Sequence, residues 1–281
     1  MSAAQAKEFD RKGYHFPIRV MDATDALRFR TSLEALERAE GGALSATTGR
    51  KPHLLLTEWA SLVRHPLILD AVESVIGPNI LCWGSDFFIK NPGDGKIVSW
   101  HQDSTYWGLS PPDIVTAWVA LAPSTPQSGC LRVIPGSHLR DQLPHRESYA
   151  ANNLLSRGQE VEVAVDEAMA VDVVLQPGEA SLHHVRLVHG SKRNESTDRR
   201  IGFAIRYVPT HVKQLNPGQD SATLVRGVDT HGNFELEPAP VADFHPDAVA
   251  AHARLIDAQA KILLKGTRPK SAVPNDDPTG R

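Results

Sequence analysis

The 281-residue chain has few cysteines and little net charge, and it lacks long apolar runs. Its two cysteines, Cys82 and Cys130, cannot form a disulfide scaffold and do not match the spacing of a zinc motif. No apolar run approaches the roughly 20 residues that a membrane-spanning helix needs. The formal net charge of −3 offers no basic surface for nucleic acid or for an anionic membrane. We therefore expect neither nucleic acid nor a membrane as a partner.

Targeting signals are also missing from the two ends of the sequence. Residues 1–10 carry charged side chains where a secretory signal needs an apolar segment. The last residues, Pro-Thr-Gly-Arg, do not form a peroxisomal signal. Together with the scarcity of cysteine, these features predict a cytoplasmic protein. We expect its partner to be a small molecule. The composition is equally compatible with a monomer and a homodimer.

The length and composition are those of an ordinary globular protein, with 41% hydrophobic residues and a mean hydropathy of −0.28. All-β barrels of this length commonly form one domain. We expect a single domain over residues 1–281. Within it we distinguish an N-terminal helical segment (1–78), a β-rich core (79–209), a C-terminal extension with a helix (210–266) and a frayed tail (267–281).

Short strands dominate the predicted core. Apolar periodicity predicts helices only over residues 23–40, 66–76 and 246–264. Between the last two, glycine- and proline-rich turns separate short strand-like segments, at 80–90, 98–104, 114–122, 131–134, 168–175, 180–184 and 201–208. Many short strands favour a sandwich or jelly roll over an α/β fold. Residues 140–165 have no clear pattern, which is typical of either a substrate loop or a solvated excursion.

A His-Gln-Asp tripeptide, at residues 101–103, closes one of these strands. Alternate side chains of a strand leave the same face about 7 Å apart, so His101 and Asp103 can converge while Gln102 points away. Two imidazoles and one carboxylate are the ligands of non-haem Fe(II) oxygenases, and they leave three coordination positions open. The second imidazole must come from a distant strand, and the candidates are His183, His184 and His189.

The strand after these histidines has two different faces. One face carries two arginines and two small residues: Arg200, Gly202, Ala204 and Arg206. The other is a packing surface made of Ile201, Phe203, Ile205 and Tyr207. A guanidinium on the first face can hold a carboxylate with two hydrogen bonds. Arg206 has two interpretations, an internal salt bridge or a contact with an anionic group of a substrate.

An ordered set of motifs between about residues 80 and 208 resembles the phytanoyl-CoA dioxygenase family. The motifs are Ser-Trp-His-Gln-Asp at 99–103, Ala-Trp at 117–118, Gly129, Val-Ile-Pro-Gly-Ser-His at 133–138, His-Gly-Ser at 189–191 and Arg200. Members of this family are Fe(II)- and 2-oxoglutarate-dependent oxygenases with a double-stranded β-helix (jelly-roll, cupin-like) core. The resemblance therefore implies Fe(II), 2-oxoglutarate and O2 as cofactor and co-substrates.

The resemblance also implies roles for individual residues. The metal ligands, which are also the catalytic residues, are expected to be His101, Asp103 and His189. Arg200, assisted by Ser191, matches the arginine that binds the distal carboxylate of 2-oxoglutarate. Gln102 and Trp118 match positions that line the co-substrate pocket, although a tryptophan on a strand is as often a core residue.

Further residues are candidates for substrate or supporting contacts. Asp86 and Lys90 fall near family positions that touch co-substrate or substrate. Tyr106 can belong to an aromatic substrate wall or to the packing of its loop. His184 can support the site or pack in the core, whereas we expect His183 to be structural or solvent-facing.

The resemblance further implies the hydroxylation of an unactivated C–H bond with release of succinate and CO2. Related halogenases replace the carboxylate ligand with a small residue, so the presence of Asp103 favours hydroxylation, or desaturation or cyclisation. Because no basic patch suits coenzyme A, we expect a small or medium-sized metabolite as the substrate. Two alternatives remain: a cupin-like zinc or manganese hydrolase or isomerase, active without 2-oxoglutarate, and a non-catalytic jelly-roll protein that binds its ligand without metal.

Overall fold

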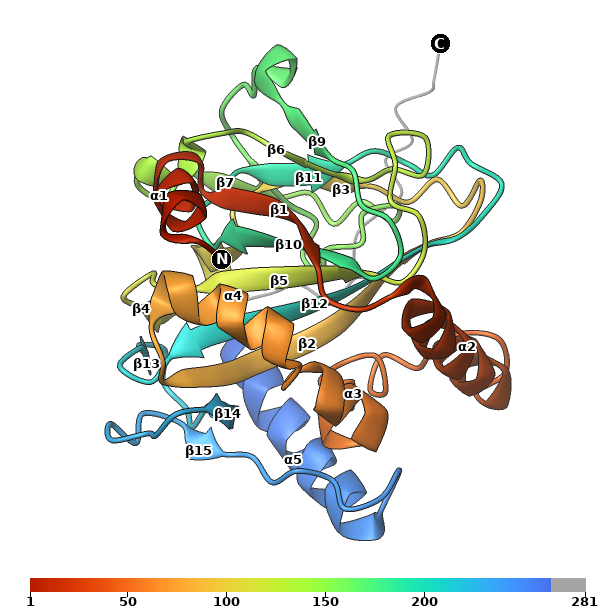
Figure 1. Ribbon diagram of the computed structural model, residues 1–281, viewed down its shortest axis with the longest axis vertical. Coiled ribbons are helices and arrows are strands. Elements are labelled where there is room, and N and C mark those ends of the chain that lie inside the picture. Colours follow the sequence, from red (N-terminus) through yellow and green to blue (C-terminus); the bar gives the residue numbers. More distant parts are fainter. Residues whose placement is uncertain (264–281) are drawn as a thin grey trace.

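Two β-sheets form the centre of the protein. The structure is a computed structural model, and it describes residues 1–263. The larger sheet has the strand order β1-β10-β5-β12-β2-β14-β15 (Figure 1). Its strands are β1 (Tyr14–Arg19), β2 (Ile80–Lys90), β5 (Val115–Ala120), β10 (Glu179–His184), β12 (Arg200–Pro209), β14 (Ser221–Arg226) and β15 (Glu235–Leu236). The smaller sheet has the order β3-β11-β6-β9 and consists of β3 (Val98–His101), β6 (Leu131–Val133), β9 (Val171–Val173) and β11 (His189–Ser191).

The predicted jelly-roll class is confirmed. The pairs β10–β5, β5–β12 and β12–β2 are all antiparallel, as are the pairs of the smaller sheet. Two short ladders complete the strands, β4 (Leu109–Ser110) with β13 (Lys213–Gln214) and β7 (His145–Glu147) with β8 (Gln159–Val161). Four 3-10 turns punctuate the loops, η1 (Pro52–Leu54), η2 (Asp103–Tyr106), η3 (Ser137–Leu139) and η4 (Glu167–Met169).

Helices cover the outer face of the larger sheet (Figure 1). They are α1 (Ala3–Lys12), α2 (Ala23–Ala39), α3 (Thr57–Leu62) and α4 (Pro66–Ile76), each of which contributes residues to the apolar cluster on that face. A fifth helix, α5 (Pro246–Leu263), contributes no residue to this cluster, and its Gln259 and Leu263 line a cavity on the other side of the sheet. The predicted helices 23–40 and 66–76 are therefore confirmed, and 246–264 is confirmed as far as Leu263. Pro66 at the first turn of α4 and Gly77 at its end act as the sequence suggested. No helix within residues 1–263 has both the length and the apolar character for crossing a bilayer.

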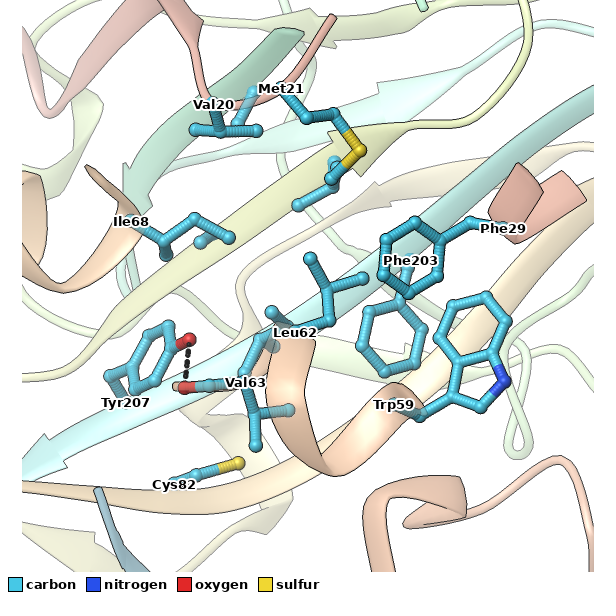
Figure 2. Packing of buried hydrophobic residues seen from close by; sticks show 14 of the residues in the cluster. Val20, Met21, Phe29, Trp59, Leu62, Val63, Ile68, Cys82, Phe203 and Tyr207 are labelled. Atoms are coloured by element: carbon cyan, nitrogen blue, oxygen red, sulfur yellow. Dashed lines mark hydrogen bonds between the residues drawn. The ribbon is translucent and has the colours of Figure 1, made fainter. Parts of the chain in front are cut away.

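The largest apolar cluster lies between these helices and the sheet (Figure 2). The Trp59 ring from α3 lies 4.9 Å from the Phe203 ring of β12 and 5.2 Å from the Phe29 ring of α2, measured between centroids. The Tyr207 hydroxyl donates a 2.9 Å hydrogen bond to the Val63 carbonyl, so its polar end is satisfied inside the core. This packing anchors the outward face of β12 and thereby fixes where its inward face points.

Strand β12 alternates as predicted. Its outward residues, Ile201, Phe203, Ile205 and Tyr207, all belong to the cluster beneath the helices. Of its inward residues, Arg200, Ala204 and Arg206 line a cavity between the two sheets. The alternation places two guanidinium groups inside the sandwich, where a second layer of structure can position a ligand against them.

Several boundaries differ from the prediction. Strand 98–104 ends at His101, because the chain turns into η2 at Asp103. Strand 168–175 shortens to β9, which η4 precedes. The N-terminal segment is not only helical, since β1 joins the edge of the larger sheet beside β10. Pro17 cannot donate to a sheet ladder and is tolerated there because β1 is an edge strand. Strand β14, from the C-terminal extension, pairs with β2.

Candidate metal and co-substrate site

Three side chains from two strand ends converge inside the sandwich. His101 ends β3 and His189 begins β11, and these residues are direct partners in the antiparallel ladder. Asp103 follows two positions after His101 at the start of η2. One ligand atom from each residue lies within 4.8 Å of the other two, which makes this a metal-type site of two imidazoles and one carboxylate. The Oδ1 atom of Asp103 is 3.4 Å from Nε2 of His101 and 4.0 Å from Nε2 of His189.

Both histidines are oriented by a hydrogen bond between Nδ1 and a backbone carbonyl. Nδ1 of His101 lies 2.9 Å from the Ser99 carbonyl, and Nδ1 of His189 lies 2.9 Å from the Leu187 carbonyl. A carbonyl only accepts, so each Nδ1 carries the proton and each Nε2 presents a lone pair to the centre. In metal-ligating histidines, the ring nitrogen that does not face the metal usually donates to a carbonyl or carboxylate in this way.

The charge states also suit a cation. Burial, reinforced by His101 nearby, lowers the pKa of His189 well below its ordinary value, so this imidazole is neutral. Burial alone would raise the pKa of Asp103, but contacts with His101 and His183 hold it well below its ordinary value. The site therefore presents a carboxylate anion and, at His189, a neutral nitrogen donor, as metal binding requires.

Arg200 lies in the same cavity as the three ligands and has no acidic partner among residues 1–263. Its guanidinium donates a 2.9 Å hydrogen bond to the Gly129 carbonyl, and its buried Nε has no hydrogen-bond partner in that part of the chain. Burial lowers the pKa of Arg200 to about 10, so the group stays charged. A buried cation without a counter-ion is costly, and an anionic ligand would remove that cost.

Lys90 is a second buried basic residue, next to Arg200. It is the ladder partner of Arg200 across β2 and β12. Its Nζ atom donates a 2.6 Å hydrogen bond to the hydroxyl of Ser191, which lines the cavity, and another to the Lys192 carbonyl. Burial, followed by repulsion from Arg200, lowers the pKa of Lys90 to about 6. The donor set therefore fits a carboxylate at the Arg200 end of the cavity and a metal at the other end.

Trp118 forms a wall of the same cavity. The guanidinium carbon of Arg200 lies 5.4 Å from the centre of the Trp118 ring, within the range of a cation–π contact. Gly202, which pairs with Ala120 beside Trp118, leaves room for this ring, because a Cβ atom at Gly202 would overlap the indole. The sequence predicted Trp118 in the wall but did not reveal why the neighbouring position is glycine.

Three predicted residues lie elsewhere. The Gln102 side chain does not line the cavity, because its amide binds the Arg186 carbonyl at 2.7 Å and the Leu143 backbone at 2.8 Å. His184 packs its ring 5.2 Å from that of His138, with burial lowering its pKa to about 4. The Tyr106 ring lies 4.2 Å from the guanidinium carbon of Arg157. It lines neither this cavity nor the second cavity described below.

His183 is the correction that matters most. We expected it to be structural or solvent-facing, yet it is 3% exposed and lines the cavity beside the triad. Its Nε2 atom is 3.7 Å from Oδ2 of Asp103. Ala180 and Leu182 occupy the helix-facing core, so Ser181 and His183 must face inward on β10. Thr116, the ladder partner of His183 on β5, also lines the cavity and was missed by the sequence reasoning.

A second cavity, of about 260 Å³, adjoins the first and shares Phe88, Asp103 and Arg206 with it. Arg206 forms an ion pair with Asp86, so the internal salt bridge is the interpretation that the structure supports. The Arg206 guanidinium carbon also lies 5.7 Å from the ring centre of Trp107. Residues 154–156 line this cavity, so part of the unpatterned segment 140–165 forms a wall rather than a solvated excursion.

Comparison with known proteins identifies the family. The model of the family described as phytanoyl-CoA dioxygenase (PhyH) matches residues 9–202. A probable alpha-ketoglutarate-dependent hypophosphite dioxygenase from Stutzerimonas stutzeri is 28% identical over 256 residues, which cover 82% of this chain and 88% of the relative. The apo structure of the non-heme monooxygenase ThoJ is 35% identical, with a TM-score of 0.83 and coverage of 93% of this chain and 98% of that one.

A further solved structure contains the expected cofactors. CytC3 with Fe(II) and alpha-ketoglutarate is 28% identical, with a TM-score of 0.65 and coverage of 88% of this chain and 97% of that one. These similarities agree with the His-Asp-His metal site and with Fe(II), 2-oxoglutarate and O2 as cofactor and co-substrates. The chain therefore belongs to the phytanoyl-CoA dioxygenase family of Fe(II)- and 2-oxoglutarate-dependent oxygenases.

Proposed function

We propose that this protein hydroxylates an unactivated C–H bond of a small or medium-sized metabolite, with conversion of 2-oxoglutarate to succinate and CO2. One observation carries the proposal: a metal-type triad lies in a single cavity with a buried guanidinium that has no acidic partner within residues 1–263. A hydrolase or isomerase built on the same triad would give Arg200 nothing to bind.

Each residue has a defined task in this proposal. His101, Asp103 and His189 hold Fe(II), which supplies the redox chemistry with O2 when it is bound. Arg200 and Ser191 bind the distal carboxylate of 2-oxoglutarate, and Trp118 lines its pocket. The apolar side chains of Val98, Leu131 and Phe88 line the cavity and exclude water from the reacting centre.

Asp103 favours hydroxylation over halogenation. Its Oδ1 atom faces both histidines and fills the position that a halide would need. The second cavity meets the first at Asp103, so a C–H bond placed there lies next to the metal ligands. Its ion pair between Arg206 and Asp86 and its aromatic wall at Trp107 suit a molecule that has both polar and apolar parts.

Anaerobic titration with Fe(II) and 2-oxoglutarate tests the proposal. The two together should give a weak visible metal-to-ligand absorption band, whereas a hydrolase, an isomerase or a binding protein should give none. Absence of the band from correctly folded protein would refute the proposal. Metabolites that stimulate succinate formation in air then identify the substrate.

A further inference from the structure

A third imidazole faces the carboxylate of the metal site. His183 differs from the two histidines of the triad, because its Nδ1 atom has no hydrogen-bond partner within residues 1–263. Its Nε2 atom lies 3.7 Å from Oδ2 of Asp103. It does not belong to the group of ligand atoms that lie within 4.8 Å of one another. His183 therefore faces the side of the carboxylate that the two ligand histidines do not.

The two oxygens of Asp103 have different surroundings. Oδ1 faces Nε2 of His101 and Nε2 of His189. Oδ2 faces Nε2 of His183 and, at 3.4 Å, the donating hydroxyl of Thr116. Thr116 and His183 are direct partners across β5 and β10, so one rung of the larger sheet supplies both donors. Side chains on the same rung are neighbours on the same face of the sheet.

Asp103 needs such support because of its place in the chain. Strand β3 ends at His101, and Asp103 opens a four-residue 3-10 turn rather than continuing the strand. The ladder therefore ends at His101, and one hydrogen bond of 3.0 Å, from the Asp103 N–H to the Val185 carbonyl, holds the backbone of Asp103 without fixing which way its carboxylate turns. A carboxylate that binds a metal through both oxygens would also occupy one of the three positions that 2-oxoglutarate and O2 require.

We infer that His183, with Thr116, is a positioning residue that binds Oδ2 of Asp103 and leaves only Oδ1 for the metal. This inference rests on the proposed function, since it assumes that the triad holds Fe(II). His183 donates through Nε2–H and is not itself a metal ligand. Partners of this kind orient metal-ligating groups, and their removal typically weakens metal binding about 10- to 100-fold.

Metal affinity in the absence of turnover tests this role. The metal-free protein is titrated with Co(II) against a chromogenic chelator. His183→Phe replaces the imidazole with an aromatic ring that has no nitrogen, and it should weaken Co(II) binding about 10- to 100-fold. His183→Leu is a second replacement, should the phenyl ring prevent folding. His183→Gln restores a side-chain N–H and should bind Co(II) within about threefold of the wild type.

Thr116→Val should weaken Co(II) binding less than His183→Phe does. The effects of these two substitutions should be non-additive in the double variant, because both residues bind one oxygen of Asp103.

His184→Gln is the matched control, because it changes the adjacent imidazole, which lies outside the cavity. It should leave Co(II) binding unchanged. Equal affinity of His183→Phe and the wild type would overturn the positioning role. Equal loss in His183→Gln and His183→Phe, with a changed Co(II) absorption spectrum, would instead make His183 a ligand. If the wild type itself binds no metal, the proposed function fails; if it binds metal and the variants do not differ from it, only the present inference fails.

Discussion

Two buried polar clusters in this protein differ in how their charges are satisfied. The first, which we call the closed cluster, consists of Lys51, His53, Ser221, Thr223 and Glu237. Lys51 and Glu237 form an ion pair, and both side chains are 2% exposed or less. Glu237 also accepts hydrogen bonds of 2.7 Å from Ser221 and 2.6 Å from Thr223. Every charge in the closed cluster therefore has a partner within the protein.

The second, which we call the open cluster, consists of the buried Lys90, His101, His189 and Arg200 and the partly buried Asp103. Its two basic side chains, Lys90 and Arg200, lack acidic partners within residues 1–263, and its carboxylate faces the imidazoles of the two histidines. A buried charge that is satisfied within the chain stabilises one structure, whereas a buried charge that is not satisfied there indicates a ligand. The comparison predicts that substitutions in the closed cluster reduce stability, and that substitutions in the open cluster reduce binding.

The largest expected effect is on stability. Glu237→Gln should lower the free energy of unfolding by about 3–5 kcal/mol, because it leaves the Lys51 ammonium buried without a counter-ion. Urea denaturation in the absence of ligands measures this change. Glu195→Gln is the control, since Glu195 pairs with Arg193 at the surface and should cost about 1 kcal/mol or less. Equal costs for the two variants would contradict the distinction between the clusters.

Arg200→Met should show the opposite behaviour. We expect 2-oxoglutarate affinity to fall at least about 100-fold, equivalent to about 3 kcal/mol or more, while Co(II) binding persists. The free energy of unfolding should change by about 1 kcal/mol or less, because the removed charge has no ionic partner in the part of the chain that the structure describes. Calorimetry and urea denaturation measure the two quantities. Collapse of metal binding with retained 2-oxoglutarate affinity would show that the role of Arg200 is misassigned.

The neighbouring arginine provides a matched control. Arg199 immediately precedes β12, and its side chain donates two 2.8 Å hydrogen bonds to Glu37 of α2, on the outer side of the sheet. Arg199→Met should therefore reduce stability and leave 2-oxoglutarate affinity unchanged. A loss of 2-oxoglutarate affinity in this variant would mean that the position of Arg200 depends on the ion pair of Arg199 beside it.

Gly202→Ala should affect both properties to an intermediate degree. Its Cβ atom would overlap the Trp118 ring, so we expect a stability loss of about 1–3 kcal/mol and weaker 2-oxoglutarate binding as the ring is displaced. Gly84→Ala is the control, because its Cβ atom would meet only Arg206 Cδ at an ordinary 3.8 Å. Combining Gly202→Ala with Trp118→Leu should recover part of the stability. No recovery would place the strain elsewhere.

The smallest effect is one of protonation. Because the pKa of Lys90 is lowered to about 6, this amine is neutral at pH 8 in the free protein. A carboxylate bound at Arg200 favours the charged form, so binding should take up a proton, and affinity should fall as the pH rises above about 6. Calorimetry at pH 8 in two buffers of different ionisation enthalpy measures the uptake. Lys90→Met should abolish it, and proton release by the wild type would contradict the prediction.

Much of this arrangement could be predicted from local patterns. The alternation of β12 separates its arginines from its core residues, and the tripeptide contributes His101 and Asp103 to the metal site. The third member, His189, was implied by the family resemblance and not by a local pattern. The choice between His183 and His184 could not be made in this way. Strand β10 is covered by helices on one face and lines the cavity on the other, so neither face shows the polar pattern of a solvent-facing side.

The sequence by itself determined the class of fold, the ligand types and the strand face that presents Arg200, because alternation and spacing are local properties. Only the tertiary structure decided which oxygen of Asp103 faces the ligand histidines and that His183 and Thr116 face the other. It also decided that Gln102 binds Arg186 and Leu143 instead of lining the cavity. These outcomes depend on the pairing of β10 with β5 and on the turn at η2, which bring together residues far apart in the chain.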